Sequence, residues 1–297
     1  QMIPVYIFYS MFGLQRTGDL AWAAGDSRAR GFLVGGTAGR TTLNGEGLQH
    51  EDGHSHLVAA TIPNCVSYDP TFGYEVAVIV RDGLRRMVTE QEDVFYYLTM
   101  MNENYAHPPM LEGTRDGILR GLYQLRDAQD QSAPRVQLLG SGSILREVLA
   151  AAELLRDEFG VHADVWSATS FTELRRDGLD VERWNLLHPG EPPRRSFVEE
   201  QLGGRPGPVI AATDWVKAYA DQIRPFVSAP YRVLGTDGFG RSDRREGLRH
   251  FFEVNRFFVA VAALKSLADA GVVPRATVSQ AIERFKIDPA KPNPMRS

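Results

Sequence analysis

Short apolar runs alternate with amphipathic stretches along the chain, and this alternation limits the possible folds more than any other feature. FLVGGT (residues 32–37), IPNCVSY (62–68) and VFYYLTMM (94–101) are apolar runs bounded by turn residues, which is typical of buried strands. Between the last two, YEVAVIVRDGLRRM carries apolar residues at helical spacing. Strand, helix and strand in that order predict parallel strands joined by a right-handed crossover.

The alternation stops and then restarts, which predicts two α/β domains. NENYAHPPMLEGTRDG interrupts it with two prolines and two glycines, and the polar stretch RDAQDQSAP follows. We therefore expect a first domain over residues 1–112, a linker over 113–134 and a second domain over 135–297. In the second domain we expect strands over 136–139, 163–170, 208–213 and 231–240, a helix over 144–159 that ends at Gly160, and further helices over 171–187, 214–223, 244–270 and 276–285.

Composition excludes several classes of function. With 43% hydrophobic and 24% charged residues, the 297-residue chain can bury large cores. A net charge of −4 leaves no electrostatic footprint for nucleic acid or for an anionic membrane, and no apolar run reaches the ~18–20 residues of a membrane span. The single cysteine, Cys65, cannot form a disulfide within the chain. We therefore expect a reducing, cytoplasmic compartment and an inert thiol in a buried strand.

The segment GRTTLNGEGLQHEDGHSH (residues 39–56) is the densest group of candidate catalytic side chains. Within it, HEDGH matches the zinc-protease pattern H-E-x-x-H, which needs a helix to place both histidines on one face. Gly45, Gly47 and Gly53 interrupt the segment, so zinc is the least favoured of three interpretations. The others are a solvent-facing polar loop, and a catalytic or substrate-binding His50 in a loop whose glycines let the backbone approach a ligand.

The segment YSMFGLQRTGD is the second candidate. Tyr9, Phe12 and Arg16 are spaced i, i+3 and i+7, which would place a hydroxyl, an aromatic face and a guanidinium on one side of a helix. An amphipathic core helix is the plainer alternative. An arginine on that stripe would need a partner if buried, and Glu46 is a possible one.

Two glycine-rich loops are weaker candidates. GSGS lies between a predicted strand and a predicted helix, where its N–H groups could hold a phosphate, but helix capping by Ser141 or Ser143 is the favoured interpretation. GTDGFGRSD contains Asp237 and Asp243 as possible helix caps. It offers no nucleophile with a base beside it, so we expect a structural or interfacial role.

The first residues suggest a larger protein. The chain begins with Gln1 and continues directly into an aromatic, β-branched run that is unusual at an exposed terminus. We expect this chain to be a piece of a longer protein. The surface that covers residues 3–12 would then lie upstream or on another chain.

Several long motifs resemble one enzyme family. YIFYSMFGLQRTGDLAWAAGDSRARGF, GGTAGRTTLNGEGLQHEDGHSH and YDPTFGYEVAVIVRDGLRRM are similar to the thiamine-dependent decarboxylating component of the bacterial pyruvate dehydrogenase complex, in its homodimeric form. MNENYAHP, VQLLGSGSILREV, SFTELRRDGLDVERWN, VLGTDGFGRSD and FKIDPAKPNP continue the resemblance to the end of the chain. The chain would correspond to roughly the last third of that family's polypeptide.

This resemblance implies a transketolase-like α/β fold. Residues 1–112 would be the second part of a pyrimidine-binding domain, and residues 135–297 a transketolase C-terminal-type domain. Thiamine diphosphate and Mg²⁺ would be the cofactors, with the metal ligands and the cofactor-activating glutamate upstream, so the fragment alone would be inactive. The protein would be a homodimer that decarboxylates pyruvate and reductively acetylates lipoyl groups of the dihydrolipoyl acetyltransferase core.

Roles for individual residues are also implied by the resemblance. Phe12 is similar to the ring that stacks on the aminopyrimidine. Tyr9 and His50 match groups that reach the bound pyruvate and the intermediate that follows it. Arg16 and Glu46 match polar residues that pass a proton between the two active sites of the dimer.

Two alternatives remain open at this point. Residues 135–297 could form a non-catalytic dimerisation and docking module, or the fold could serve a related dehydrogenase of a larger 2-oxo acid. In each case His54 and His56 are expected to be supporting or loop residues.

Overall fold

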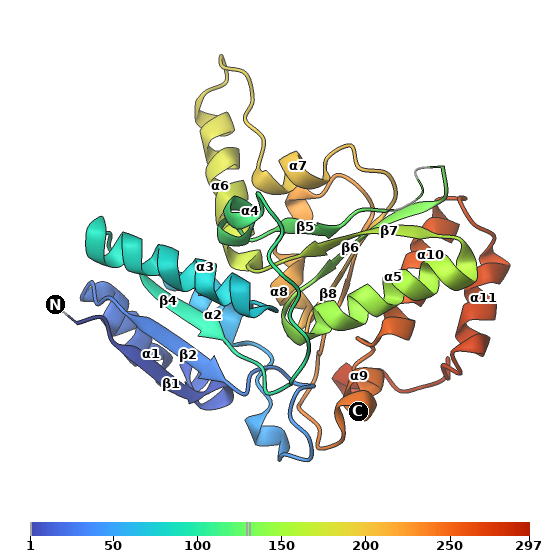
Figure 1. The fold of residues 1–297 in the computed structure, drawn as a ribbon, viewed down its shortest axis with the longest axis horizontal. Helices are drawn as coiled ribbons and strands as arrows, with labels where there is room; N and C mark the ends of the chain where they lie inside the picture. Colours follow the sequence, from blue (N-terminus) through green and yellow to red (C-terminus); the bar gives the residue numbers. More distant parts are fainter. Residues whose placement is uncertain (1, 129, 131) are drawn as a thin grey trace.

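Two sheets organise the chain in the computed structural model, which describes residues 2–128, 130 and 132–297 (Figure 1). Gln1 and positions 129 and 131 of the expected linker lie outside the described residues. The first sheet has the order β1-β2-β4-β3, with every pair parallel. The second has the order β5-β7-β6-β8-β9, in which only β5 is antiparallel to its neighbour. The predicted succession of two α/β units is therefore confirmed.

The first unit contains the expected strands and one strand that was not expected. Its elements are β1 (Val5–Tyr9), η1 (Ser10–Phe12), α1 (Leu14–Asp26), β2 (Phe32–Gly36), η2 (Leu48–His50), α2 (Ser55–Ala60), β3 (Cys65–Tyr68), α3 (Gly73–Leu84), the π-helical turn η3 (Arg85–Thr89) and β4 (Phe95–Thr99). The strands predicted over 32–37, 62–68 and 94–101 are confirmed, and so is the helix between the last two. Cys65 is buried, and burial raises the pKa of its thiol to about 12, as an inert thiol requires.

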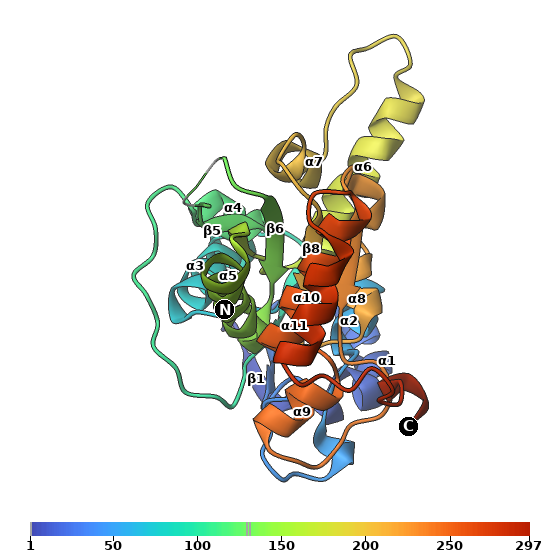
Figure 2. The ribbon, with the colours of Figure 1, turned by 90° about the vertical axis from the view of Figure 1, so that its right-hand side faces the viewer.

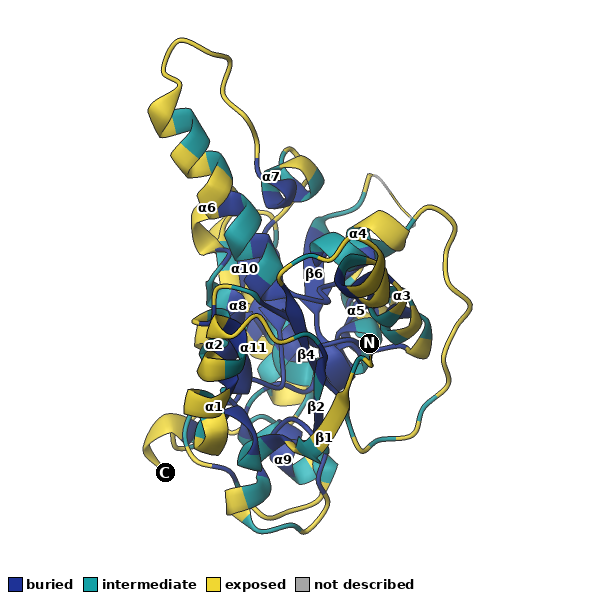
Figure 3. Ribbon diagram, turned by 90° about the vertical axis from the view of Figure 1, so that its left-hand side faces the viewer, coloured by how far each residue is buried: buried dark blue, intermediate teal, exposed yellow. Residues whose placement is uncertain are grey.

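Strand β1 lies at the edge of the first sheet, where it is visible as an exposed ribbon (Figure 3). It pairs with β2, so part of the apolar run at residues 3–12 finds its partner within this chain. The side chains of Val5, Tyr6 and Ile7 nevertheless remain 61–68% exposed. That a further surface covers them stays a prediction.

The expected linker over 113–134 is wrong for its first half. Residues 115–126 form α4 (Arg115–Arg120) and β5 (Tyr123–Arg126), and β5 pairs with β7 in the second sheet. This edge strand could not be recognised from the sequence, because only Tyr123 in it is buried and its other side chains are half-buried. Where the chain divides into domains stays a prediction.

The second unit follows the expected alternation closely. Its elements are β6 (Arg135–Gly140), η4 (Gly142–Ile144), α5 (Leu145–Phe159), β7 (His162–Ser167), α6 (Phe171–Leu187), α7 (Phe197–Leu202), β8 (Val209–Ala212), α8 (Lys217–Asp221), η5 (Arg224–Phe226), β9 (Tyr231–Leu234), α9 (Arg245–Phe251), α10 (Arg256–Asp269), α11 (Arg275–Arg284) and η6 (Pro294–Arg296). Helices α5, α10 and α11 cover one face of the sheet, and α6, α7 and α8 cover the other (Figure 2).

One predicted helix divides into two. The helix expected over 244–270 is interrupted after α9, because the Asn255 side chain accepts hydrogen bonds from the N–H groups of Phe257 and Phe258 and so starts α10. The helix expected over 214–223 is also shorter, since only α8 is regular.

The left-handed glycine at the end of α5 allows the energetic cost of an unfavourable backbone conformation to be measured. Gly160 has φ +62°, and no atom lies within 4 Å of the place where a Cβ would project. Gly160→Ala is therefore expected to lower the free energy of unfolding by about 1–2 kcal/mol through backbone strain alone. Gly190→Ala is the matched control, because its site is equally open and its φ lies outside the left-handed region. Equal unfolding free energies of the two variants in urea would contradict this expectation.

A buried carboxyl joins the two units. Asp69, which follows β3, accepts hydrogen bonds from Thr99 Oγ1 (2.7 Å), Trp215 Nε1 (2.7 Å) and Ser141 Oγ (2.8 Å). Burial raises the pKa of Asp69 to about 6. The expected capping by Ser141 or Ser143 is wrong: Ser141 bonds across the junction, and Ser143 Oγ has no hydrogen-bond partner among the described residues. The GSGS loop therefore connects the units.

Candidate active site

The segment YSMFGLQRTGD is not one helix. Tyr9 is the last residue of β1, Phe12 ends the 3₁₀ turn η1, and Arg16 lies in the first turn of α1. Pairing with β2 holds Tyr9 extended, which the i, i+3, i+7 spacing could not reveal. The prediction of a single helical stripe is wrong, although the three side chains still converge.

The segment GRTTLNGEGLQHEDGHSH (residues 39–56) does not form the helix that an H-E-x-x-H zinc site needs. His50 ends the 3₁₀ turn η2, and α2 begins only after His54. The carboxylate of Glu51 accepts a hydrogen bond from the N–H of Arg241 (2.6 Å), in the second unit. Across the described part of the chain, no group of three His, Cys, Asp or Glu side chains is placed to hold a metal ion. The H-E-x-x-H geometry is therefore not formed.

Three rings from the two segments meet. The His50 ring centroid lies 5.3 Å from that of Tyr9 and 5.2 Å from that of Phe12, to which it is nearly perpendicular. The rings of Tyr9 and Phe12 are 5.9 Å apart. Tyr9 is 38% exposed, and the other two are partly buried, so the cluster forms an open wall and not a closed core.

The two charged candidates join this wall. Glu46 Oε2 lies 3.2 Å from His50 Nδ1, and the Arg16 guanidinium carbon lies 4.7 Å from the centre of the Phe12 ring. The pairing of Arg16 with Glu46 is not seen among the ion pairs of the described residues, because the carboxylate faces the imidazole instead. The two groups lie at ion-pair distance without hydrogen-bond geometry, because His50 Nδ1 has no hydrogen-bond partner among the described residues. The structure thus brings all five predicted site residues together.

The second unit supports the loop that carries His50. The N–H of Val216 donates to the carbonyl of Gly53 (2.8 Å), and the N–H of Gly45 donates to the carbonyl of Asp243 (3.0 Å). With the Glu51–Arg241 bond, these contacts place GTDGFGRSD at the interface, as expected.

The two aspartates of GTDGFGRSD act at helix starts. Asp237 accepts from the N–H of Lys217 (2.9 Å), the first residue of α8. Asp243 accepts from the N–H of Arg244 (2.7 Å), directly before α9. The predicted capping role agrees only with the Asp237 contact, which reaches the first N–H of α8, because Asp243 bonds the residue before α9 and that helix has no side-chain cap.

Buried charges at the start of the loop were not foreseen. Arg40 donates to the carbonyls of Thr236 and Gly238, and Asp214 accepts from the N–H of Thr41 (3.1 Å). Burial raises the pKa of Asp214 to about 7. Gly39 has φ +87°, and a Cβ there would overlap the Asp214 carboxylate, so this close approach requires glycine.

His56 is a supporting residue beneath the loop. It is fully buried, its Nε2 lies 2.9 Å from Thr99 Oγ1, and its ring contacts Trp215 (4.6 Å) and Tyr219 (4.8 Å). Burial lowers the pKa of His56 to about 3. The imidazole is therefore neutral in the folded protein at physiological pH.

This burial predicts a loss of stability in acid. The folded protein holds His56 neutral to a pKa of about 3, whereas an unfolded chain protonates near pH 6.5 and so binds more protons below that pH. Between pH 7 and pH 5, His56 should lower the free energy of unfolding by about 2 kcal/mol. Urea titrations of wild type and His56→Gln at both pH values should show a smaller pH dependence in the variant. Identical pH dependences would contradict the assignment.

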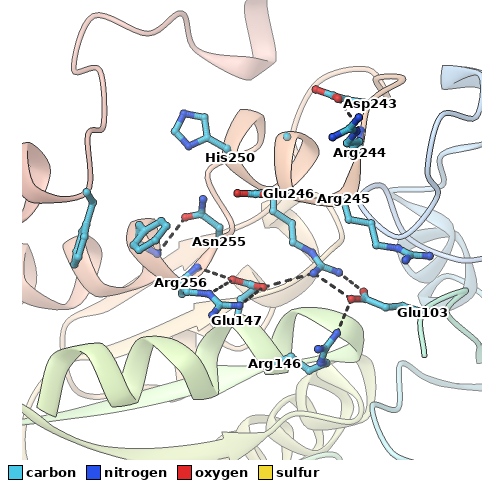
Figure 4. A pocket seen from close by; sticks show the side chains of 14 residues that line it. Glu103, Arg146, Glu147, Asp243, Arg244, Arg245, Glu246, His250, Asn255 and Arg256 are labelled. Carbon is cyan, nitrogen blue, oxygen red and sulfur yellow. Dashed lines mark hydrogen bonds and ion pairs between the residues drawn. The ribbon is translucent and has the colours of Figure 1, made fainter. Parts of the chain in front are cut away.

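An alternating chain of charges lies beside a cavity of about 790 Å³ (Figure 4). Glu103 pairs with Arg146 (2.5 Å) and with Arg249, and Glu147 pairs with Arg249 (3.5 Å) and Arg256 (2.9 Å). The Arg249 side chain also donates to Thr41 Oγ1 (3.3 Å) in the loop that leads to His50. The cavity contains none of the five site residues, and its ion pairs tie the end of the first unit to α5, α9 and α10.

Sequence reasoning missed the residues that hold the loop, chiefly Arg40, Asp52, Asp214 and Arg249. No local motif marked them. Arg249 donates to Thr41, which lies 208 positions away. Asp52 makes two local bonds, to positions 54 and 55, but its other two donors lie 42 and 37 positions away.

Comparisons with known proteins bear on the whole chain. The family model "Pyruvate dehydrogenase E1 component middle domain" matches residues 1–108, and "Transketolase-like TK C-terminal domain" matches residues 121–255. The pyruvate dehydrogenase E1 components of Cupriavidus necator, Pseudomonas aeruginosa and Escherichia coli are 66%, 65% and 60% identical over 99% of this chain. Each alignment covers 33% of the relative, so the chain spans about a third of the length of the curated relatives it matches.

Solved structures agree on the fold. The transketolase of Campylobacter jejuni superposes with a TM-score of 0.65 over 89% of this chain and 36% of that chain, at 16% identity. That of Leishmania mexicana gives 0.65 over 93% and 36%, also at 16% identity. The expected transketolase-like α/β fold is therefore confirmed. Among the described residues, the helices are too short or too polar to cross a membrane. The identity of 60–66% to pyruvate dehydrogenase E1 components extends over 99% of this chain, and the chain therefore belongs to the family of the pyruvate dehydrogenase E1 component.

Proposed function

We propose that this chain is part of a pyruvate dehydrogenase (acetyl-transferring) component, an oxidoreductase of the cytoplasm. With thiamine diphosphate and Mg²⁺, the whole protein decarboxylates pyruvate and reductively acetylates lipoyl groups of the dihydrolipoyl acetyltransferase core. It acts as a homodimer. The high identity to E1 components over 99% of the chain supports the choice of pyruvate over a larger 2-oxo acid.

The observation that carries this proposal is the meeting of Tyr9, Phe12 and His50, with Glu46 against the imidazole and Arg16 over Phe12. An aromatic face, a phenol and an imidazole with a free nitrogen on one open wall suit an aromatic cofactor and a small anionic substrate.

The residues present fit one side of thiamine diphosphate. The partly exposed ring of Phe12 offers a face for the aminopyrimidine, and Tyr9 with His50 would face the reacting carbon. The wall has no cluster of acidic side chains, so diphosphate and Mg²⁺ would be held by residues outside this chain. When bound, the cofactor supplies the electron sink for loss of carbon dioxide.

The side chains of the wall supply hydrogen bonds and protons. Pyruvate is a carboxylate, and attack on its keto carbon creates a negatively charged oxygen. The Tyr9 O–H and an imidazole N–H can donate to these oxygens where charge develops. His50, whose imidazole lies beside the Glu46 carboxylate, serves as the general acid or base of the wall. Arg16 and Glu46 then lead a proton away from the wall toward the second site of the dimer.

A complementation experiment tests the proposal. The residues that precede this chain in the longer protein are added in trans, and pyruvate-dependent dye reduction is measured with thiamine diphosphate and Mg²⁺. Activity that requires both pieces is expected. A complex that dimerises without turnover would favour the docking module, and turnover of a larger 2-oxo acid in preference to pyruvate would favour a related dehydrogenase.

A further inference from the structure

We propose that Asp52 is a positioning residue that fixes His50 at its distance from the Tyr9 and Phe12 rings. The inference rests on the proposed function, since it deepens the account of the same site. Asp52 touches none of the three rings in the contacts described above. It acts through two side chains of the Phe12 segment and two backbone N–H groups of the His50 segment.

The first pair of contacts holds the segment of Phe12. Ser10 Oγ donates to Asp52 Oδ2, and Gln15 Nε2 donates to Asp52 Oδ1. Residues 10 and 15 lie on either side of Phe12 in the chain, so the carboxylate binds both the turn η1 and the start of α1. The two bonds therefore restrain the chain on both sides of Phe12 relative to the loop.

The second pair of contacts holds the segment of His50. The N–H groups of His54 and Ser55 both donate to Asp52 Oδ1, at 3.0 Å each. These bonds close the chain into a turn directly after η2 and lead it into α2. The turn fixes the direction in which the chain leaves His50, two residues before Asp52.

A rigid strand lies beneath this clamp. Tyr97 of β4 is fully buried, and its hydroxyl donates to Ser55 Oγ (2.9 Å) and lies 3.3 Å from Ser10 Oγ. Both segments that Asp52 joins therefore contact Tyr97, on an inner strand of the first sheet. Asp52 is itself completely buried, and its four donors compensate the burial of its carboxylate.

The expected consequence is catalytic as well as structural. A misplacement of about 1 Å at a reacting group can slow an enzyme about 100-fold. Asp52→Asn keeps an oxygen for the three donors at Oδ1 and places an amide beside Ser10. The fold should survive, while the spacing between η1 and the loop changes.

The matched control is Glu75→Gln. Glu75 is also completely buried and also has four donors: Thr71 N (2.5 Å), Phe72 N (2.8 Å), Tyr123 Oη (2.7 Å) and Ser167 Oγ (2.6 Å). It joins the two units away from the ring wall. The two variants therefore lose the same kind of interaction at comparable burial, and only one of them lies beneath the site.

The experiment measures kcat and KM for pyruvate, thiamine diphosphate binding and thermal unfolding in the full-length protein. Asp52→Asn is expected to lower kcat at least about 10-fold with cofactor still bound, and Glu75→Gln to stay within about 3-fold of wild type. Adding Asp52→Asn to His50→Ala should cost several-fold less than adding it to wild type, because the group that it positions is gone.

Three results would overturn the inference: unchanged kcat in Asp52→Asn, an equal loss in Glu75→Gln at equal loss of Tm, or full additivity with His50→Ala. The proposed function fails separately, if His50→Ala itself remains fully active. If Asp52→Asn does not fold, Ser10→Ala removes one of the four bonds, and the same kcat comparison with Glu75→Gln applies.

Discussion

Replacing His50 with alanine in the full-length protein should slow pyruvate-dependent dye reduction at least about 100-fold, because a positioned proton donor contributes about 10²–10⁴-fold. Cofactor binding should survive, since Phe12 and the rest of the wall remain. Steady-state rates at saturating pyruvate, with thiamine diphosphate binding followed by calorimetry, measure both quantities. The contact with Glu46 makes Glu46→Gln a weaker version of the same change.

His54→Ala is the matched control for this prediction. His54 lies four positions later on the same loop, and its hydrogen bond to Asp52 uses the backbone N–H, which alanine keeps. The control should retain nearly all activity. Equal losses in both variants would show that the loop, and not the imidazole of His50, is what matters.

Removing the Arg249 side chain should cause the largest loss of stability. Arg249 is 6% exposed and pairs with both Glu103 and Glu147, each of which is also nearly buried on its side chain. Arg249→Leu leaves buried carboxylates short of a cation, and breaking a buried pair in this way costs about 3–5 kcal/mol. Urea denaturation followed by circular dichroism measures the change. The loop near His50 should loosen as well, because the bond to Thr41 is lost.

Arg224→Leu is the control for this second prediction. Arg224 pairs with Asp221 on the surface, where both side chains are 44–49% exposed, and such pairs contribute about 0–1 kcal/mol. A loss in Arg249→Leu no larger than in Arg224→Leu would mean that the alternating charge chain is only a surface network.

Local pattern was sufficient for most of the secondary structure. The helix predicted over 171–187 coincides with α6, and the one ending at Gly160 coincides with the end of α5. These elements carry their own periodicity and end signals. Strand β5 was missed because its side chains are mostly half-buried and form no apolar run. The residues of β1 do form an apolar run, but it was interpreted as a surface covered from outside the chain and not as a strand that pairs with β2.

For the candidate site, residue identities could be predicted but their geometry could not. Resemblance singled out Tyr9, Phe12, Arg16, Glu46 and His50, and the fold brings them together. The single-helix arrangement failed because strand pairing with β2, which is a tertiary contact, overrides a helical spacing. The sequence predicted no role for Asp52 beyond its place in the zinc-like motif, because its donors at positions 10 and 15 lie far from it in sequence.

A crystal structure of the full-length protein with thiamine diphosphate and Mg²⁺ tests the central claim most directly. The account predicts the aminopyrimidine stacked on Phe12, with Tyr9 and the free nitrogen of His50 facing the thiazolium carbon. A cofactor bound far from Phe12, or a zinc ion held between His50 and His54, would contradict it.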